Sequence, residues 1–424
     1  MTKTHSTSPT MQQLRPNWAT TALFVLLFSG PPMFRVRDAN ESLEGTIDYV
    51  VILRLLVLIA GGLWVLYQCR KQFRKGRGYL PFIMRLPQML GLVVVAGLSV
   101  SVLVSTAPSL SAFKVCEMLV SLSFTATFVE LYGIEECLNK LFLASTLLCL
   151  VIAVCVFAAP DLVLFTSETG ATRLRGELIA PTEIVAMFAL ILLVARARKP
   201  WTVRFLFLLS FFGILLVFSL SRTAYMILAL FFALYLWKLK KRVYTYWAAA
   251  AAMILYFLGL VPSLSAYRNP ESIFTLSDRV GLWGYLTAVT LQKSPLIGLG
   301  YYSASRVYGP EYNEGLGTAH SMFFETFVGG GILGLVPLVL LCSVTGIYSI
   351  RLLRYRGSRV AFTVSMMFAA TLMFGSIGGD FGYGPLGITF WSLCAMLPIL
   401  HGHLRPSRSI PRRNGATLRS PVQA

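Results

Sequence analysis

His320 is the residue best suited by type and position to acid–base chemistry. It stands where a long polar segment meets an apolar one, whereas the other three histidines fall in or beside the two tails. An imidazole has an ordinary pKa of about 6.5, so it is mostly neutral at pH 7 and can accept a proton from a hydroxyl group. At the start of a helix, free backbone N–H groups also favour a bound anion. His320 is therefore the candidate general base.

Four arginines are expected on the same side of the molecule as His320: Arg173, Arg175, Arg222 and Arg279. Arginine keeps its charge and can bind two phosphate oxygens at once. The set therefore suits a phosphate or pyrophosphate carried on a lipid, and an anionic lipid headgroup also fits. For Arg222, a second interpretation is that it caps the preceding helix.

Ionisable residues inside apolar segments are rare and are candidates for function, and three of them stand out in this chain. These are Arg54, Lys114 and Glu117. The interpretation favoured by the sequence is an internal Lys–Glu ion pair, with the arginine reaching out to the membrane interface. The alternative is a direct contact with substrate.

The composition indicates the elements that must position these side chains. Of the 424 residues, 56% are hydrophobic and only 13% are charged, whereas a soluble domain carries about 25% charged residues. Apolar stretches of about 20 residues, the length that spans a bilayer as a helix, recur along the chain. The sequence therefore predicts an all-α polytopic membrane protein.

We expect about twelve transmembrane helices and one long loop. The helices are expected near residues 18–34, 46–67, 86–106, 110–132, 140–160, 178–196, 201–219, 223–238, 244–262, 321–349, 360–378 and 384–401. The chain then divides into an N-terminal tail (1–17), helices one to nine (18–262), the loop (263–320), helices ten to twelve (321–401) and a basic tail (402–424). Pro337 is a candidate break in the tenth helix.

The net charge of +19 arises from lysines and arginines clustered between the apolar stretches. This is the pattern of the positive-inside rule and not of a nucleic-acid-binding face. It predicts both termini in the cytoplasm and the loop 263–320 on the outer face. Within the loop, Ser277-Asp278 followed by Val280, Trp283, Leu286 and Val289 predicts a capped amphipathic helix suited to the membrane surface.

The sequence offers no cluster of residues that could hold a metal ion. There is no Cys-x-x-Cys motif, and the seven cysteines lie in or beside the apolar stretches. We therefore expect no metal and no cofactor.

Several short motifs follow one another in the second half of the chain. His320-Ser321 is followed after nine residues by Gly331-Ile-Leu-Gly334. Before it stand Arg173-Leu-Arg-Gly176, Ser219-Leu-Ser-Arg222, Ser277-Asp-Arg279 with Trp283, and Lys293-Ser-Pro-Leu-Ile-Gly-Leu-Gly300. In this order, the motifs resemble the O-antigen ligase and polysaccharide polymerase superfamily over roughly residues 170–350.

The resemblance implies a metal-independent glycosyltransferase of the GT-C type in the bacterial inner membrane. Such enzymes take a glycan from undecaprenyl diphosphate on the periplasmic face and pass it to an acceptor hydroxyl. By resemblance, the loop 263–320 is periplasmic, His320 assists the acceptor, and Arg222 and Arg279 bind the pyrophosphate. Arg173 and Arg175 are candidates for further substrate contacts.

The sequence leaves three functions open. A ligase passes the glycan to lipid A-core, and the nine-residue spacing favours it. A polymerase passes it to a second lipid-linked repeat unit of an O-antigen or exopolysaccharide, and works with a chain-length regulator. A transporter or flippase for the lipid-linked glycan also suits many helices with intramembrane charges, but the chain shows no related halves.

Overall fold

The structure is a computed structural model of the 424-residue chain. It describes residues 15–30, 48–75, 85–166, 172–176, 179–197, 202–238, 279–313, 317–355, 357–379 and 381–404. The predicted ninth helix (244–262), the predicted cap Ser277-Asp278, the N-terminal fourteen residues and residues 405–424 lie outside these ranges.

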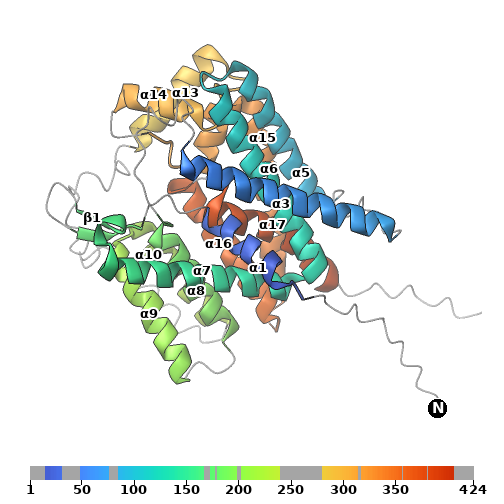
Figure 1. The fold of residues 1–424 in the computed structure, drawn as a ribbon, viewed down its shortest axis with the longest axis vertical. Coiled ribbons are helices and arrows are strands. Elements are labelled where there is room, and N and C mark those ends of the chain that lie inside the picture. Colours follow the sequence, from blue (N-terminus) through green and yellow to red (C-terminus); the bar gives the residue numbers. More distant parts are fainter. Residues whose placement is uncertain are drawn as a thin grey trace, which may run out of the picture.

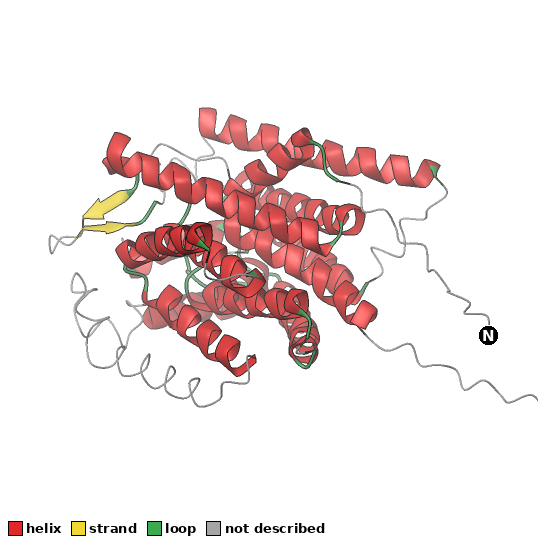
Figure 2. Cartoon of the chain, turned by 90° about the horizontal axis from the view of Figure 1, so that it is seen from below, coloured by secondary structure: helices red, strands yellow, loops and turns green. Residues whose placement is uncertain are grey.

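Helices make up most of the described residues (Figures 1 and 2). The first half contains α1 (Trp18–Ser29), α3 (Tyr49–Arg74), α5 (Leu86–Ser101) with the 3-10 turn η1 (Val102–Val104), α6 (Pro108–Tyr132), α7 (Ile134–Ala158) with η2 (Pro160–Leu162), α8 (Thr182–Arg196), α9 (Val203–Ser219) and α10 (Arg222–Lys238). The second half contains α13 (Arg279–Lys293), α14 (Ser303–Tyr312), α15 (Met322–Leu353), α16 (Arg359–Ile377) and α17 (Gly384–Leu404). Helices therefore stand at eleven of the twelve predicted positions.

Seven of these described helices are long and apolar enough to cross a membrane. They are α3, α5 continued by η1, α6, α7, α15, α16 and α17, while α1, α9 and most of α10 are shorter apolar helices. The chain is thus a multi-pass membrane protein by length and composition of its helices, and the number twelve stays a prediction.

The core lies around α17 and α8, whose side chains are almost all buried. α17 packs against α16, α15, α6 and α1, and α8 packs against α7, α9 and α16. α3 lies at the periphery, where Ile52, Leu56 and Ile59 expose half or more of their surface, as a lipid-facing helix does. Aromatic contacts join it to the bundle: Trp64 packs on Phe124 of α6, with ring centroids 4.7 Å apart.

The segment after residue 278 forms two helices that pack on α15 (Figure 1). The sequence predicted α13 but not α14, whose Gly309-Pro310 step is typical of a turn. Leu282 and Leu286 of α13 are fully buried against α14 and α15, whereas Val280 is 51% exposed. Trp283 and Val289 of the predicted stripe also pack inward, so the apolar face of α13 packs against protein and only Val280 of the stripe is exposed.

The long helix α15 is interrupted at Gly331 and not at Pro337, six residues further on. Gly331 has φ 58° and ψ −153°, a conformation open essentially to glycine alone. A Cβ there would lie 2.5 Å from the carbonyl carbon of Leu296, so the backbone of the segment before α14 occupies that space. Contact between two backbones, and not proline, explains the interruption.

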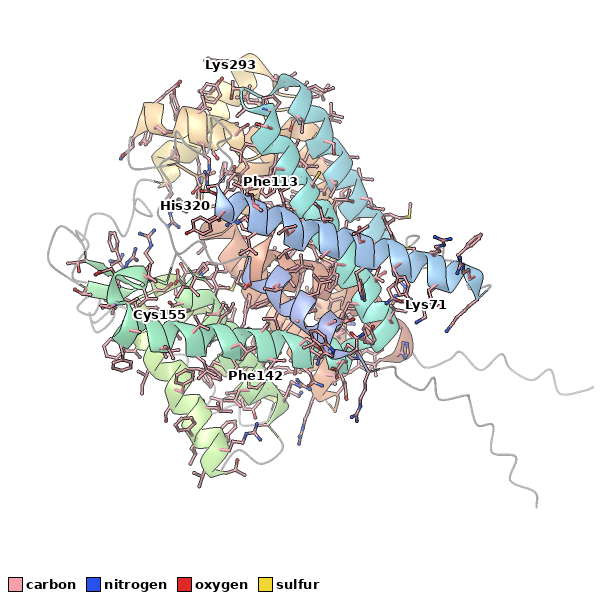
Figure 3. All side chains as sticks on the ribbon, in the orientation of Figure 1. Lys71, Phe113, Phe142, Cys155, Lys293 and His320 are labelled. Atoms are coloured by element: carbon pink, nitrogen blue, oxygen red, sulfur yellow. The ribbon has the colours of Figure 1, made fainter. Side chains whose placement is uncertain are left out.

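The lysines and arginines that the sequence places between spans gather at one set of helix ends. They include Lys71 and Arg74 at the end of α3, Arg196 at the end of α8, Arg351 near the end of α15 and Arg359 at the start of α16. Figure 3 shows Lys71 at one end of α3 and His320 near the other. The helix ends with these basic clusters therefore lie away from His320. On the side of His320, the cations Arg54 and Lys114 are accompanied by the carboxylates of Glu117 and Glu325.

Candidate functional site

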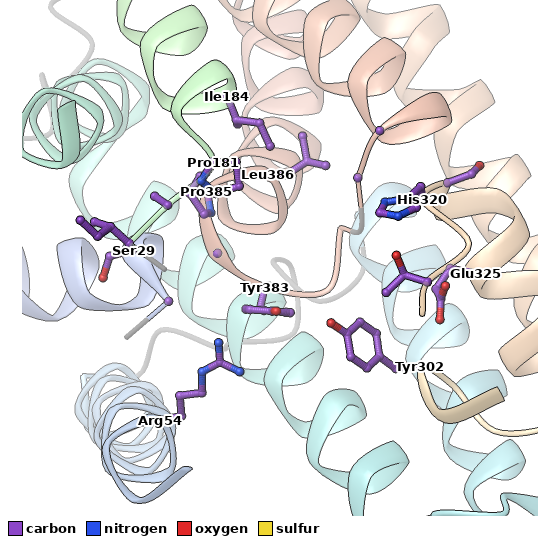
Figure 4. Close-up of a pocket in the computed structure, with 18 residues that line it drawn as sticks. Ser29, Arg54, Pro181, Ile184, Tyr302, His320, Glu325, Tyr383, Pro385 and Leu386 are labelled. Carbon is purple, nitrogen blue, oxygen red and sulfur yellow. The ribbon is translucent and has the colours of Figure 1, made fainter. Parts of the chain in front are cut away.

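A cavity of about 260 Å³ opens at the helix ends opposite the basic clusters (Figure 4). It is lined by the end of α1, the second turn of α3, the starts of α8, α15 and α17, and the segment after α16. Its polar lining includes Ser29, Arg54, Tyr302, Thr318, His320, Ser321, Glu325 and Tyr383. This volume lies just below the range of roughly 300–1,000 Å³ for small-ligand pockets. The cavity can therefore hold the reacting part of a larger substrate.

His320 lines this cavity, as its proposed role requires, and its backbone is in the left-handed region with φ 50°. This conformation is uncommon for residues other than glycine, although histidine adopts it more often than most, and it persists where surrounding contacts hold it. Both polar backbone atoms of the preceding residue, Ala319, are held. Its N–H donates to Oε2 of Glu325 (3.1 Å), and its carbonyl accepts from Nε1 of Trp283 (2.7 Å).

Glu325 and Trp283 are themselves fixed. Glu325 is buried in the first turns of α15 and accepts a second hydrogen bond from Oγ of Ser305 at 2.7 Å. The indole of Trp283 stacks on Phe324, with ring centroids 4.6 Å apart and planes 10° from parallel. Helices α13, α14 and α15 therefore jointly orient His320, and the motif residue Trp283 has a positioning role.

The glycine motifs on either side of His320 meet in space. Ile332 and Leu333 donate backbone hydrogen bonds to the carbonyls of Pro295 and Leu296, both at 3.0 Å. Gly298 has φ 73°, and a Cβ there would lie 2.4 Å from the carbonyl oxygen of Gly329. The run 293–300 thus lies directly on the start of α15. These contacts between the two motifs hold the backbone on either side of His320 in place.

The wall of the cavity across from His320 contains Arg54, which the sequence did not assign to the site. Figure 4 shows Arg54 on one side, His320 and Glu325 on the other, and Tyr383 and Tyr302 between them. The Arg54 guanidinium carbon lies 5.3 Å from the ring centroid of Tyr383. The only signal in the sequence was an arginine inside an apolar segment.

The predicted ion pair between Lys114 and Glu117 is confirmed. Nζ of Lys114 lies 2.7 Å from Oε2 of Glu117, and both residues are 3% exposed. The same ammonium lies 3.6 Å from the ring centroid of Tyr383. The Lys114 charge lowers the pKa of the Tyr383 phenol, although burial of the ring acts in the opposite direction. The ion pair thus supports the aromatic wall of the cavity.

Arg279 and Arg222 do not line the cavity. Arg279 opens α13, and its Nη1 donates to the carbonyl of Ile377, the last residue of α16 and the neighbour of the cavity-lining Gly378. A cation at the end of a helix satisfies free carbonyls there. Arg222 begins α10, which packs against α8 and α16. Arg279 thus contacts the residue next to the cavity lining, whereas Arg222 begins a helix that packs against α8, whose start lines the cavity.

Arg173 and Arg175 lie outside the cavity as well, on a short hairpin that the sequence did not predict. Strands β1 (Leu164–Thr166) and β2 (Thr172–Leu174) pair antiparallel, with Phe165 opposite Arg173. Both guanidinium carbons lie over the ring of Phe165, at 5.2 Å and 5.1 Å from its centroid. The carbonyl of Arg175 accepts a hydrogen bond from Thr182 (3.2 Å), so the hairpin adjoins the start of α8.

The described residues leave polar atoms at the cavity available to a ligand. Arg54 Nε and Ser321 Oγ are buried, belong to residues that line the cavity, and have no hydrogen-bond partner among the described residues. Within the same residues, no three His, Cys, Asp or Glu side chains lie together as a metal site would need. The arrangement combines an imidazole, a guanidinium and hydroxyl groups, which suits proton transfer beside a bound anion.

Comparison with known proteins supports one family. Residues 205–339, about a third of the chain, match the family described as O-antigen ligase. No curated protein matches the chain. The resemblance of the motifs to the O-antigen ligase and polymerase superfamily is thus confirmed. His320, Glu325 and Gly331 lie within the matched residues, whereas Arg54 and Tyr383 lie outside them.

Proposed function

We propose, from the match to the O-antigen ligase family, that the chain is a ligase-type glycosyltransferase. It moves a glycan from undecaprenyl diphosphate to an acceptor hydroxyl, and it needs neither a metal nor a cofactor. At the level of the family, members are ligases or polymerases acting on lipid-linked glycans. Donor, acceptor and metal independence belong to the proposal.

The observation that carries the proposal is the position of His320 in the cavity. It is the histidine of the family-matched segment, it lines a polar cavity, and three helices hold its strained backbone. Strained residues of this kind cluster at functional sites.

In the proposed reaction, His320 takes the proton of the acceptor hydroxyl. The acceptor oxygen forms a bond to the anomeric carbon of the donor sugar as the bond from that carbon to the diphosphate breaks. The bonding electrons leave with undecaprenyl diphosphate, and the imidazolium later releases its proton to water. Because the donor is already activated, orientation of the reactants and stabilisation of the leaving charge are enough.

Arg222 and Arg279 are proposed to bind the pyrophosphate from the rim of the cavity. Arg279 touches the last carbonyl of α16, beside the cavity-lining Gly378. Arg173 and Arg175 are proposed as further substrate contacts, on a hairpin that adjoins the start of α8. A cavity of this size takes the diphosphate and its first sugar, so the rest of the donor extends past this rim.

The proposed location is the bacterial inner membrane, with both termini in the cytoplasm and the cavity facing the periplasm. The support is the separation of the cavity from the basic helix ends, which the positive-inside rule assigns to the cytoplasm. The proposed acceptor is lipid A-core, and membrane lipids surround the helices.

The test is transfer by the purified chain from an undecaprenyl-linked glycan in buffer containing EDTA. We expect a new glycosidic bond on lipid A-core, with activity unchanged by EDTA. Product on a second lipid-linked glycan, and none on lipid A-core, identifies a polymerase and predicts a chain-length regulator as partner. Movement of glycan across liposomes without a new bond contradicts the enzyme and identifies a transporter.

A further inference from the structure

Arg54 is the charged side chain of the cavity to which the proposed reaction assigns no role. It lies in the second turn of α3, among side chains that face lipid, such as Ile52 and Leu56. A guanidinium in such a helix is expensive, and intramembrane arginines usually face an interior cavity or a functional partner. Here the side chain reaches the cavity wall across from His320 (Figure 4).

Arg54 shares its nearest carboxylate, Glu117, with a second cation. The carboxylate of Glu117 is already paired with Lys114 at 2.7 Å, and the Lys114 ammonium also lies against the Tyr383 ring. Two cations and one carboxylate therefore meet at Tyr383. The other carboxylate of the cavity, Glu325, lies on the opposite wall and accepts hydrogen bonds from Ser305 and Ala319. A cluster built for stability alone has no need of the second cation, because a buried charge without a counter-ion is costly.

The hydrogen-bonding capacity of Arg54 is also incomplete. Its Nε is buried and has no hydrogen-bond partner among the described residues, while its guanidinium packs over Tyr383. The Oγ of Ser321, next to His320, is likewise buried and unpartnered. Unpartnered buried donors on two walls of one cavity indicate a ligand with acceptor oxygens.

We propose that Arg54 binds the diphosphate of the lipid-linked donor inside the cavity. This inference rests on the proposed function and deepens it. The planar fork of a guanidinium grips two phosphate oxygens, and a helix end at the membrane boundary is where the headgroup of a lipid-linked substrate lies. Tyr383 and the Lys114–Glu117 pair position the guanidinium, and the two rim arginines act on the same diphosphate from outside the lining.

The test measures, by titration, the affinity of the full chain in detergent for undecaprenyl diphosphate. Arg54→Gln is compared with Arg74→Gln, an exposed arginine at the other end of the same helix. We expect Arg54→Gln to weaken binding about 10-fold or more, since a charged hydrogen bond is removed, and Arg74→Gln to leave it unchanged. Unchanged affinity in Arg54→Gln overturns the inference.

Two further arms identify the ligand and guard against misfolding. Undecaprenyl monophosphate and phosphatidylglycerol are used as competitors of bound undecaprenyl diphosphate. If phosphatidylglycerol displaces it at the same concentration as free undecaprenyl diphosphate does, the site is a general lipid-headgroup site and the inference is overturned. If Arg54→Gln does not fold, the affinity of Arg54→Lys for undecaprenyl diphosphate is measured instead. This variant keeps the charge but loses the fork, so we expect binding weakened several-fold, and unchanged affinity overturns the inference.

Glycan transfer measured on the same preparations separates this inference from the proposed function. A chain that binds undecaprenyl diphosphate through Arg54 but forms no glycosidic bond contradicts the glycosyltransferase and leaves the diphosphate site standing. A chain that transfers glycan equally well with and without Arg54 contradicts the site alone. A wild-type chain that does not bind the diphosphate contradicts both.

Discussion

Two contributions of His320, its imidazole and its backbone conformation, can be tested separately. The imidazole can act as a base, whereas the left-handed conformation is a property of the main chain, held through Ala319 by Glu325 and Trp283. Asparagine tolerates this conformation better than most residues but cannot accept the proton. Alanine removes the base and tolerates the conformation poorly.

We expect both His320→Asn and His320→Ala to lose turnover by about 10²–10⁴-fold, since general-base assistance is worth that much. Binding of the lipid-linked donor should remain, because the proposed phosphate contacts come from other residues. The measurements are steady-state glycan transfer and donor binding. Near-normal turnover in His320→Asn, with loss only in His320→Ala, would show that the conformation matters and the imidazole does not.

The buried pair of Lys114 and Glu117 gives a second prediction at this scale. Glu117→Gln leaves the ammonium buried without its counter-ion, which typically costs about 3–5 kcal/mol. We therefore expect a lower midpoint of thermal unfolding in detergent. Adding Lys114→Met should restore part of the loss, because the remaining charge is then removed. A Glu117→Gln variant as stable as the wild type would contradict the structural role of the pair.

The sequence allowed residues on only one wall of the cavity to be predicted. His320 followed from its type and its motif, and the Lys114–Glu117 pair followed from helical spacing. Arg54 did not, because its partner Tyr383 is more than 300 positions away in the chain. Only the packing of α3 near the segment between α16 and α17 brings the two together, and no local pattern encodes that contact.

At the scale of elements, the interruption of α15 predicts an asymmetric response to two similar changes. Gly331→Ala forces a side chain into a glycine-only conformation and against the Leu296 backbone, at a cost of at least about 1–3 kcal/mol. Gly346 lies in the same helix with no atom within 4 Å of an added Cβ. We expect Gly331→Ala to lower the unfolding midpoint and Gly346→Ala to leave it unchanged or raise it. Equal midpoints would contradict the backbone contact.

Elements that bury apolar stretches were predictable, since length and hydrophobicity alone determine them. Those that depend on tertiary contact were not. The α14 helix forms although its sequence contains Gly309 and Pro310, because α13 and α15 cover it. The hairpin of β1 and β2 has three residues in each strand, too few for a sequence pattern.

At the scale of the whole molecule, the basic clusters at the helix ends away from His320 predict sidedness. Single cysteines are introduced at Asn313 and Arg354, both exposed, in a background without the seven native cysteines. An impermeant maleimide applied from the periplasmic side should label Asn313→Cys and should label Arg354→Cys only after permeabilisation. Labelling of Arg354→Cys in intact cells would mean that the cavity faces the cytoplasm, and it would contradict a periplasmic reaction.

The division of the cavity between matched and unmatched residues has a consequence for recombining such proteins. A chimera that receives residues 205–339 from this chain acquires His320 and its supporting helices, but its facing wall still comes from the host. The reverse exchange replaces α1, α3 and the segment between α16 and α17. It leaves His320 and its supporting helices unchanged and replaces the surface opposite them. Crossover points at residues 204 and 340 therefore separate the proposed base from much of the wall that faces it across the cavity.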